Sequence, residues 1–290
     1  MTRPQFVTYD VAGATLGALR WDGIEGARTV VALHGITANA WLWDPVAHHL
    51  AGGANLVALD LRGRGRSFGA DGPFGIRQHA DDVAAVISQL GGSALIAGHS
   101  MGAYVALMTA ARHPDVVSDV VLVDGGTPIP IDAGADIDDV LDTTLGPAIE
   151  RLQQIWPDRV TYYTMWSQHP AYAEGISVDL ERDLLADLIE VEGGFRTAVD
   201  EEAVRVDGRE LFADNEVRSL LDRRAEPTLI VRAPNGLMGA PPPLIGDDVR
   251  DRYSQHRWVE ADGTNHYTVL VGPRGAPLVA ESIRDALAAG

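Results

Sequence analysis

Apolar residues in this chain gather in short runs, most of which are continuous rather than alternating with polar residues. Continuous runs of this length are typical of strands buried on both faces. They occupy residues 29–33, 55–59, 93–97, 119–123, 228–232 and 256–260, after an opening hairpin predicted at residues 5–9 and 14–20. Helical periodicity separates them at residues 43–50, 76–90 and 103–113. This alternation predicts an α/β protein with a mostly parallel sheet and helices on both faces.

The alternation of predicted strands and helices stops after residue 125 and resumes near residue 227. The break opens with a loop at residues 125–139 that is rich in Gly, Pro and Asp, and it then becomes helical. The predicted helices lie at residues 139–145, 147–155, 159–167, 180–190, 201–212 and 217–223, with Pro147 and Pro157 starting or ending helices. The sequence therefore predicts a core domain of residues 1–126 and 227–290 and a helical cap of residues 127–226.

Composition narrows the classes of function. The chain has 290 residues, no cysteine and a formal net charge of −18, and all 23 of its basic residues are arginine. Disulfides, thiol catalysis and a lysine nucleophile are excluded, and an acidic surface disfavours nucleic acids and anionic membranes as partners. The first residues lack the apolar run of a signal peptide, and no apolar run reaches the length of a membrane span. We expect a cytoplasmic protein, either a monomer or a homodimer.

The most informative motif is Gly-His-Ser-Met-Gly at residues 98–102. It follows a predicted strand and precedes a predicted helix, which is the context of a nucleophile elbow. Glycines on both sides of Ser100 let the chain turn back sharply, and the turn lifts the hydroxyl above the sheet edge. The pattern predicts Ser100 as a catalytic nucleophile.

A serine nucleophile needs a general base and an acid that orients the base. Among the nine histidines, His266 lies in the loop after the last predicted strand, where the chain order Ser…Asp…His requires the base. The loop after the strand at residues 228–232 holds no carboxylate, whereas Asp124 ends the strand before the break. Asp124 is therefore the predicted acid, and Asp247 and Asp248 stay open as alternatives.

Two backbone N–H groups are expected to form the oxyanion hole. The first is that of Met101, directly after the nucleophile, and the second is that of Ile36, in the loop after the strand at residues 29–33. His34 is expected to brace this loop through hydrogen bonds, and His99 to pack against the sheet.

Two charged segments were considered as a phosphate-binding loop and a calcium-binding loop, and neither has the required pattern. Residues 60–67 are rich in Gly and Arg but lack the Gly-Lys-Ser/Thr element of a phosphate-binding loop, so we interpret them as a tight loop whose arginines pair with surface acids. The acidic residues 132–142 do not have the spacing of a calcium-binding loop, and we interpret them as a solvated loop.

Aromatic residues suggest where an apolar substrate binds, between the sheet and the predicted cap. For each of them a place in the core of the cap is the alternative. The candidates are Trp41, Trp43, Trp156, Tyr162, Tyr163, Met165 and Trp166.

Taken together, these motifs resemble the α/β-hydrolase superfamily, and specifically its serine esterase and lactonase branches. The matching positions are His34, Gly35, residues 60–67, residues 98–102, Asp124 and His266. The resemblance implies an eight-stranded sheet with a helical cap after strand 6 and no cofactor. Epoxide hydrolases and haloalkane dehalogenases of the superfamily have Asp at the elbow, so those activities are disfavoured. An acid after strand 6 is similar to a minority of members, including some that open lactones such as zearalenone.

The sequence predicts a serine hydrolase that cleaves a small apolar carboxylic ester or lactone through an acyl-enzyme. A C–C bond hydrolase of a ring-fission product would use the same three side chains. A non-catalytic ligand-binding receptor on a hydrolase scaffold is the alternative from another class of protein, and acyl transfer is a lesser variant.

Overall fold

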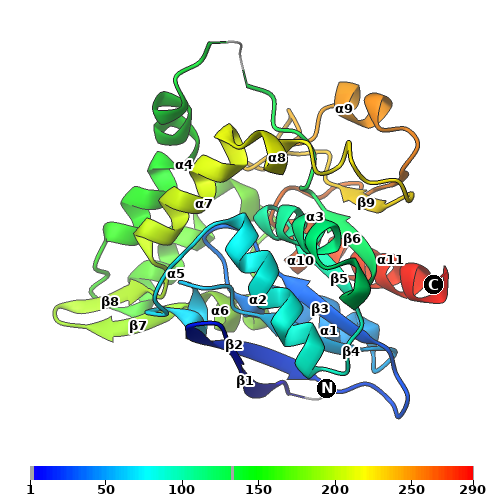
Figure 1. Ribbon diagram of the computed structural model, residues 1–290. Helices are drawn as coiled ribbons and strands as arrows, with labels where there is room; N and C mark the ends of the chain where they lie inside the picture. Colours follow the sequence, from blue (N-terminus) through cyan, green and yellow to red (C-terminus); the bar gives the residue numbers. More distant parts are fainter. Residues whose placement is uncertain (1–2, 132–133, 290) are drawn as a thin grey trace.

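The computed structural model describes residues 3–131 and 134–289, and its centre is an eight-stranded sheet (Figure 1). The strand order is β1-β2-β4-β3-β5-β6-β9-β10. β2 pairs antiparallel with β1 and β4, and all the later pairs are parallel. The predicted sheet is confirmed. The strands are β1 Gln5–Val11, β2 Ala14–Trp21, β3 Thr29–Leu33, β4 Asn55–Leu59, β5 Ala94–His99, β6 Val117–Val123, β9 Leu229–Arg232 and β10 Arg257–Glu260.

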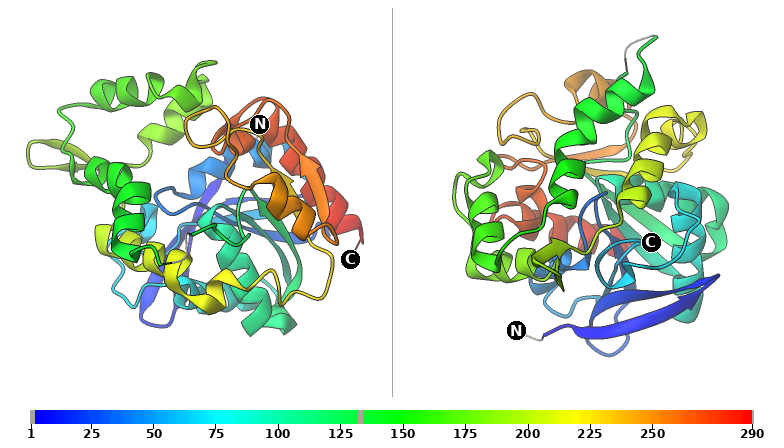
Figure 2. Two further views of the ribbon diagram at one scale, coloured as in Figure 1. Left: turned by 90° about the horizontal axis from the view of Figure 1, so that it is seen from above. Right: turned by 90° about the vertical axis from the view of Figure 1, so that its left-hand side faces the viewer.

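Helices cover both faces of this sheet (Figure 2). On one face α1 (Asp44–Leu50) packs against α11 (Gly275–Ala289), and on the other α2 (Ile76–Gln89) packs against α3 (Met101–Arg112). The central strand β5 serves both cores, because Leu95 and Ala97 join the first and Ile96 joins the second. This double burial explains why the strands are continuous apolar runs. The short elements of the core are η1 Ala40–Trp43, η2 Gly65–Ser67, η3 Pro114–Val116, α9 Asp247–Arg252 and α10 Thr268–Val271.

The residues between β6 and β9, called here the inserted segment, are mainly helical. In Figure 1 they run from green to yellow beside and above the sheet. Their elements are α4 Ile137–Gln153, α5 Arg159–Ser167, η4 Pro170–Tyr172, α6 Val178–Leu185, β7 Leu188–Val191, β8 Gly194–Thr197, α7 Glu201–Ala213 and α8 Asn215–Arg218.

Four details of the inserted segment differ from the prediction. The helix predicted at residues 217–223 is shorter and begins earlier, because α8 covers Asn215–Arg218 and turns follow it. Pro147 lies inside one continuous helix, α4, instead of dividing two helices, because α4 packs along α7 and this packing outweighs the lost backbone hydrogen bond. The predicted helix at 180–190 ends at Leu185, and β7 and β8 then form an antiparallel hairpin that turns at Gly193 with a φ of +89°. In the predicted acidic loop, α4 begins at Ile137, and residues 132–133 lie outside the described residues.

The arginines of residues 60–67 correct another prediction, because two of them are fully buried and do not pair with surface acids. Arg62 makes a two-pronged contact with the buried carboxylate of Asp82, at 2.9 Å from Nε and 2.8 Å from Nη2. Arg64 forms a 2.6 Å ion pair with the buried carboxylate of Asp207. Buried guanidinium groups need such partners, because an unpaired charge in the interior is very costly.

Asp207 connects the inserted segment to the core. It lies on α7, and its carboxylate also accepts hydrogen bonds from His79 Nε2 at 2.9 Å and from the Gly75 backbone N–H at 2.8 Å. Burial raises the pKa of Asp207, but the neighbouring His79 and Arg64 outweigh burial and bring it to about 2. The carboxylate therefore stays ionised and holds α7 against α2 and the loop after β4.

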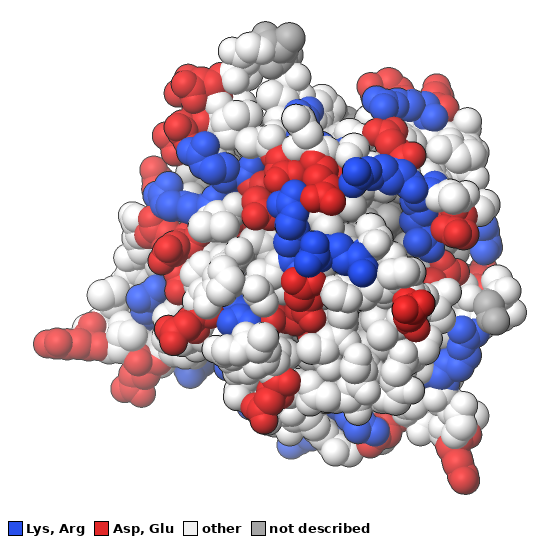
Figure 3. Space-filling view, viewed as in Figure 1, with Lys and Arg blue, Asp and Glu red and all other residues white. Residues whose placement is uncertain are grey.

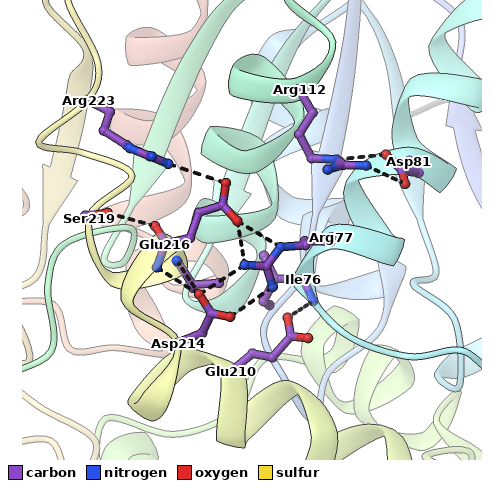
Figure 4. A network of polar contacts seen from close by, with 10 residues as sticks. Ile76, Arg77, Asp81, Arg112, Glu210, Asp214, Glu216, Ser219 and Arg223 are labelled. Atoms are coloured by element: carbon purple, nitrogen blue, oxygen red, sulfur yellow. Dashed lines mark hydrogen bonds and ion pairs between the residues drawn. The ribbon is translucent and has the colours of Figure 1, made fainter.

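A second, more exposed network fastens the same elements (Figure 4). Arg77 of α2 donates to Asp214 at 2.9 Å and to Glu216 at 2.9 Å, and these hydrogen bonds lower the pKa of both acids. Glu210 of α7 accepts the backbone N–H of Ile76 at 2.7 Å. Figure 3 shows acidic and basic side chains lying side by side on this face, around the position of α8 in Figure 1.

None of the helices in residues 3–131 and 134–289 is both long enough and apolar enough to cross a bilayer.

The Asp207 network generates a prediction about stability. The substitution Asp207→Asn removes the charge that compensates Arg64, and breaking such a buried pair costs about 3–5 kcal/mol of unfolding free energy. Urea denaturation at pH 7 measures it. Because the pKa of Asp207 falls from its ordinary 3.8 to about 2 on folding, this ionic contribution is complete above pH 3.8 and is lost as the pH falls toward 2.

The matched control is Asp138→Asn. Asp138 also pairs with an arginine of α7, Arg209, but its side chain is 70% exposed. Its loss is expected to cost under about 1 kcal/mol. Equal costs for the two variants would contradict the structural role assigned to Asp207.

Candidate active site

The turn between β5 and α3 has the backbone of a nucleophile elbow. Ser100 adopts φ +55° and ψ −120°, a conformation that L-residues rarely take. A Cβ at Gly98 would overlap the backbone of Gly102, and one at Gly102 would overlap the carbonyl of Leu33. The two glycines of the motif are therefore required by close backbone contacts. The Ser100 backbone N–H donates to Val123 O at 3.0 Å, which fixes the turn against β6.

Asp124 and His266 are in direct contact. His266 Nδ1 donates to Asp124 Oδ2 at 2.8 Å, and the other carboxylate oxygen accepts the backbone N–H of Ala233 at 3.1 Å. Asp124 is fully buried directly after β6, with φ +45°. Of the two alternative acids, Asp247 is 73% exposed and pairs with Arg232, and no hydrogen bond or ion pair joins Asp248 to His266 within the described residues. Asp124 is the acid whose geometry suits the orientation of His266.

The loop that carries His266 lies against the residue before Ser100. His99 Nε2 donates to the backbone carbonyl of His266 at 2.8 Å, and the two rings lie 4.7 Å apart. Burial lowers the pKa of His99 well below its ordinary value, so the ring is neutral and Nε2 carries its proton. Asn265 Nδ2 donates to Ala171 O at 2.8 Å and ties the same loop to the inserted segment. His99 is buried as predicted, but its role in anchoring this loop was not predicted.

The predicted oxyanion loop is held from both sides. His34 donates from Nδ1 to Gly35 O at 2.7 Å and accepts from the Leu61 backbone N–H at 3.0 Å. Burial lowers its pKa to about 3, so His34 is a neutral brace, as predicted. Arg64 Nε donates to the carbonyl of Ile36 at 3.0 Å, a contact that sequence reasoning missed. This arginine is the same one that pairs with Asp207.

The two predicted oxyanion donors are available for a ligand. Met101 is the first residue of α3, so its N–H lies outside the intrahelical ladder. The Ile36 N–H donates to no group within the described part of the chain. A Cβ at Gly35 would lie 3.5 Å from Ser100 Oγ, so the loop approaches the hydroxyl closely. The arrangement leaves polar N–H groups around Ser100.

The predicted pocket aromatics separate into two groups. Trp43 is fully buried in the core, and Trp41 packs on Phe6 with ring centroids 5.8 Å apart. Tyr163 makes no ring–ring contact among the described residues. The others belong to a group that we call the aromatic cluster. Its members are Trp156, Tyr162, Trp166, His169, Tyr172 and Tyr267.

Three members of the aromatic cluster were missed from the sequence. Tyr267 follows His266 and meets its ring at a centroid distance of 5.6 Å, so adjacency to the predicted base was an available signal. His169 and Tyr172 join the cluster only through long-range packing, for which the sequence offered no signal. The cluster thus extends from the inserted segment to the loop of the candidate base.

A cavity of about 850 Å³ lies beside this site. Its lining includes Tyr172, Asn265 and Arg274 but neither Ser100 nor His266. The cavity and the candidate triad therefore share only the loop around Asn265.

Comparison with known proteins identifies relatives over parts of the chain. A 92-residue stretch is 37% identical to 2-(acetamidomethylene)succinate hydrolase of Mesorhizobium japonicum, covering 31% of this chain and 33% of that one. A 116-residue stretch is 37% identical to an esterase of Mycobacterium tuberculosis, covering 39% and 38%. These matches span well under half of each relative's length.

Solved structures match over nearly the whole chain. The crystal structure of E-2-(acetamidomethylene)succinate hydrolase superposes with a TM-score of 0.79 at 22% identity, covering 98% of this chain and 99% of the other. A thioesterase domain from the curacin biosynthetic pathway superposes with a TM-score of 0.73 at 23% identity, covering 98% and 100%. At these identities the likeness supports the fold.

The family model for the alpha/beta hydrolase fold matches residues 28–273, which include the elbow, Asp124 and His266. The resemblance inferred from the sequence is confirmed, and the chain belongs to the alpha/beta hydrolase fold family.

Proposed function

We propose that this protein is a serine hydrolase that cleaves a carboxylic ester or lactone without a cofactor. Ser100 is the nucleophile, His266 the general base and Asp124 the acid that orients it. The observation that carries the proposal is the 2.8 Å bond between His266 Nδ1 and the buried Asp124 carboxylate, in a loop anchored beside the Ser100 elbow. Asp124 holds the proton on Nδ1, and this leaves Nε2 free to accept the proton of Ser100.

The reaction proceeds in two halves. In the first, Ser100 Oγ attacks the carbonyl carbon while His266 Nε2 takes the hydroxyl proton, and the N–H groups of Met101 and Ile36 receive the oxyanion. The tetrahedral intermediate collapses, His266 returns the proton to the leaving alkoxide, and an acyl-enzyme remains. In the second half, water gives a proton to His266 and attacks the acyl carbon. Ser100 then leaves with that proton, and the acid is released.

The relatives support a hydrolase. One is named an esterase and one a lipase of Mycobacterium tuberculosis, and a third is named 2-(acetamidomethylene)succinate hydrolase. Another relative is named epoxide hydrolase B, but the serine at the elbow of this chain favours attack on a carbonyl carbon. We also infer that the inserted segment, predicted as a cap of residues 127–226, forms a lid, since Trp166 packs 6.2 Å from Tyr267 beside His266.

Replacement of Ser100 tests the assignment of the nucleophile. Ester or lactone hydrolysis by the wild type, measured as proton release in a pH-stat across aliphatic esters, aryl esters and lactones, is expected to vanish in Ser100→Ala. Ser88→Ala is the matched control, because Ser88 is an exposed serine on α2 whose hydroxyl donates to the Ala84 carbonyl of its own helix. If Ser100→Ala retained full activity, the nucleophile assignment would be wrong. If the wild type bound an ester or lactone without cleaving it, the alternative of a non-catalytic ligand-binding receptor would be favoured. If it cleaved only a dienol ring-fission product, the alternative of a C–C bond hydrolase would be favoured.

Replacement of Asp124 tests the assignment of the acid. Asp124→Asn keeps an oxygen for the Ala233 N–H but presents an amide to His266, which favours the wrong imidazole tautomer. We expect kcat to fall about 10⁴-fold, the scale known for such acids. Stopped-flow or pH-stat rates on the best ester measure the loss.

Asp247→Asn is the control for the acid, since Asp247 is the exposed alternative. Its kcat is expected to stay within about threefold of the wild type. A loss of less than tenfold in Asp124→Asn, together with a larger loss in Asp247→Asn, would reassign the acid.

A further inference from the structure

Arg151 is an arginine without an acidic partner beside the aromatic cluster. It projects from α4, is half-buried, and places its guanidinium 4.8 Å from the ring centre of Trp166. No hydrogen bond or ion pair of its side chain is found within the described residues, whereas Arg62, Arg64 and Arg77 are each paired with carboxylates. Arg66, Arg159 and Arg196 also face an aromatic ring without an ion pair among the described residues, but the ring that Arg151 faces belongs to the aromatic cluster.

Several groups beside Arg151 can donate hydrogen bonds. Trp166, on whose face Arg151 lies, packs against Tyr162, Tyr172 and Tyr267 at ring-centroid distances of 6.5, 5.9 and 6.2 Å. Burial raises the pKa of all three tyrosines, and the charge of Arg151 lowers it. Within residues 3–131 and 134–289, none of the three hydroxyls donates a hydrogen bond. His169 accepts the Ala171 N–H through Nδ1, so its neutral ring carries a proton on Nε2.

Asp187 is the acid near enough to be affected by Arg151, but it is engaged elsewhere. Its carboxylate accepts from Asn39 Nδ2 at 3.1 Å and forms no ion pair with Arg151. Burial raises its pKa to about 7, against the lowering effects of Asn39 and Arg151. Because Asp187 makes no hydrogen bond or ion pair with Arg151, it leaves the guanidinium free to contact a ligand.

This group is continuous with the candidate triad. Trp166, which carries Arg151 on its face, packs 6.2 Å from Tyr267, and Tyr267 packs 5.6 Å from His266. Trp166 and Tyr267 therefore connect Arg151 to the candidate base through packed aromatic rings. The cation of Arg151 and the hydrogen-bond donors beside it are complementary to an anion.

We propose that Arg151, with the hydroxyls around it, binds a carboxylate of the substrate, so that the substrate class is the half-ester or anionic lactone of a dicarboxylic acid. This inference rests on the proposed function and refines the apolar substrate expected from the sequence. A carboxylate fits the planar fork of a single arginine. A more highly charged phosphate would meet only one cation in an acidic protein.

The test compares matched substrates. Monomethyl esters of succinic, glutaric and adipic acid are assayed beside methyl esters of the corresponding monocarboxylic acids. The readout is the ratio of kcat/KM for the charged ester to that for the neutral ester of equal length. The wild-type ratio is expected to exceed about ten, since a hydrogen bond to a charged group has at least this effect.

Arg151→Gln is expected to lower this ratio at least about tenfold, mainly through KM, and Arg151→Lys to restore part of it. Arg159→Gln is the matched control, because Arg159 also stacks on an aromatic ring, 4.9 Å from Phe195, but is exposed and bonds a backbone carbonyl. It should keep the wild-type ratio. If Arg151 had only a structural role, Arg151→Gln would lower the melting temperature without changing this ratio of kcat/KM values.

The outcomes separate this inference from the proposed function. Turnover of neutral and charged esters at equal efficiency, unaffected by Arg151→Gln, would overturn the carboxylate site and leave the serine hydrolase intact. If the wild type cleaved no ester, the proposed function would fail, and calorimetry with glutarate monomethyl ester on Ser100→Ala protein would decide the site alone. Loss of this binding when Arg151→Gln is added to Ser100→Ala would support the carboxylate site. Equal binding with and without Arg151→Gln would overturn the site.

Discussion

The contact between Asp124 and His266 is the interaction around which the candidate site is organised. It joins the end of β6 to a loop far along the chain, and it forms only because several backbone constraints meet there. The Asp124 backbone N–H donates to Val231 on β9 at 2.8 Å, and its carboxylate receives the Ala233 N–H at 3.1 Å. The same strand, β6, accepts the Ser100 N–H. The parallel order β5-β6-β9 therefore sets the positions of both the nucleophile and the acid.

A second set of constraints acts from outside the sheet. Arg64 contacts the Ile36 carbonyl in the oxyanion loop and the Asp207 carboxylate on α7. A buried ion pair often contributes little net stability compared with an apolar pair of the same volume. Its effect here is positional, because moving α7 would leave Arg64 without its charge partner and would free the Ile36 loop. The inserted segment and the oxyanion loop are thus coupled through one guanidinium.

The parts of this fold that depend on neighbouring residues in the sequence were predicted correctly. Strands such as Thr29–Leu33 and Asn55–Leu59 were predicted at their observed bounds, because a strand that is buried on both faces has a continuous run of apolar residues. The glycines around Ser100 predicted the elbow, because this sharp turn needs residues without side chains at the adjoining positions. The triad assignment of Ser100, Asp124 and His266 stays a prediction about chemistry, although the geometry brings Asp124 and His266 together.

The missed features depend on contacts between distant residues. Arg62 and Arg64 appeared as surface charges because their partners lie on α2 and α7. Pro147 appeared as a helix boundary because its cost is local, while the packing of α4 on α7 is not. Arg151 belongs to the same class, since nothing in its neighbours along the chain distinguishes it from a solvated arginine. Its isolation from acids, in a chain where acids outnumber bases 41 to 23, becomes informative only once its surroundings are known. The ring of Trp166 covers one face of the half-buried guanidinium, so a carboxylate that reaches it gains a stronger attraction than at a fully solvated arginine.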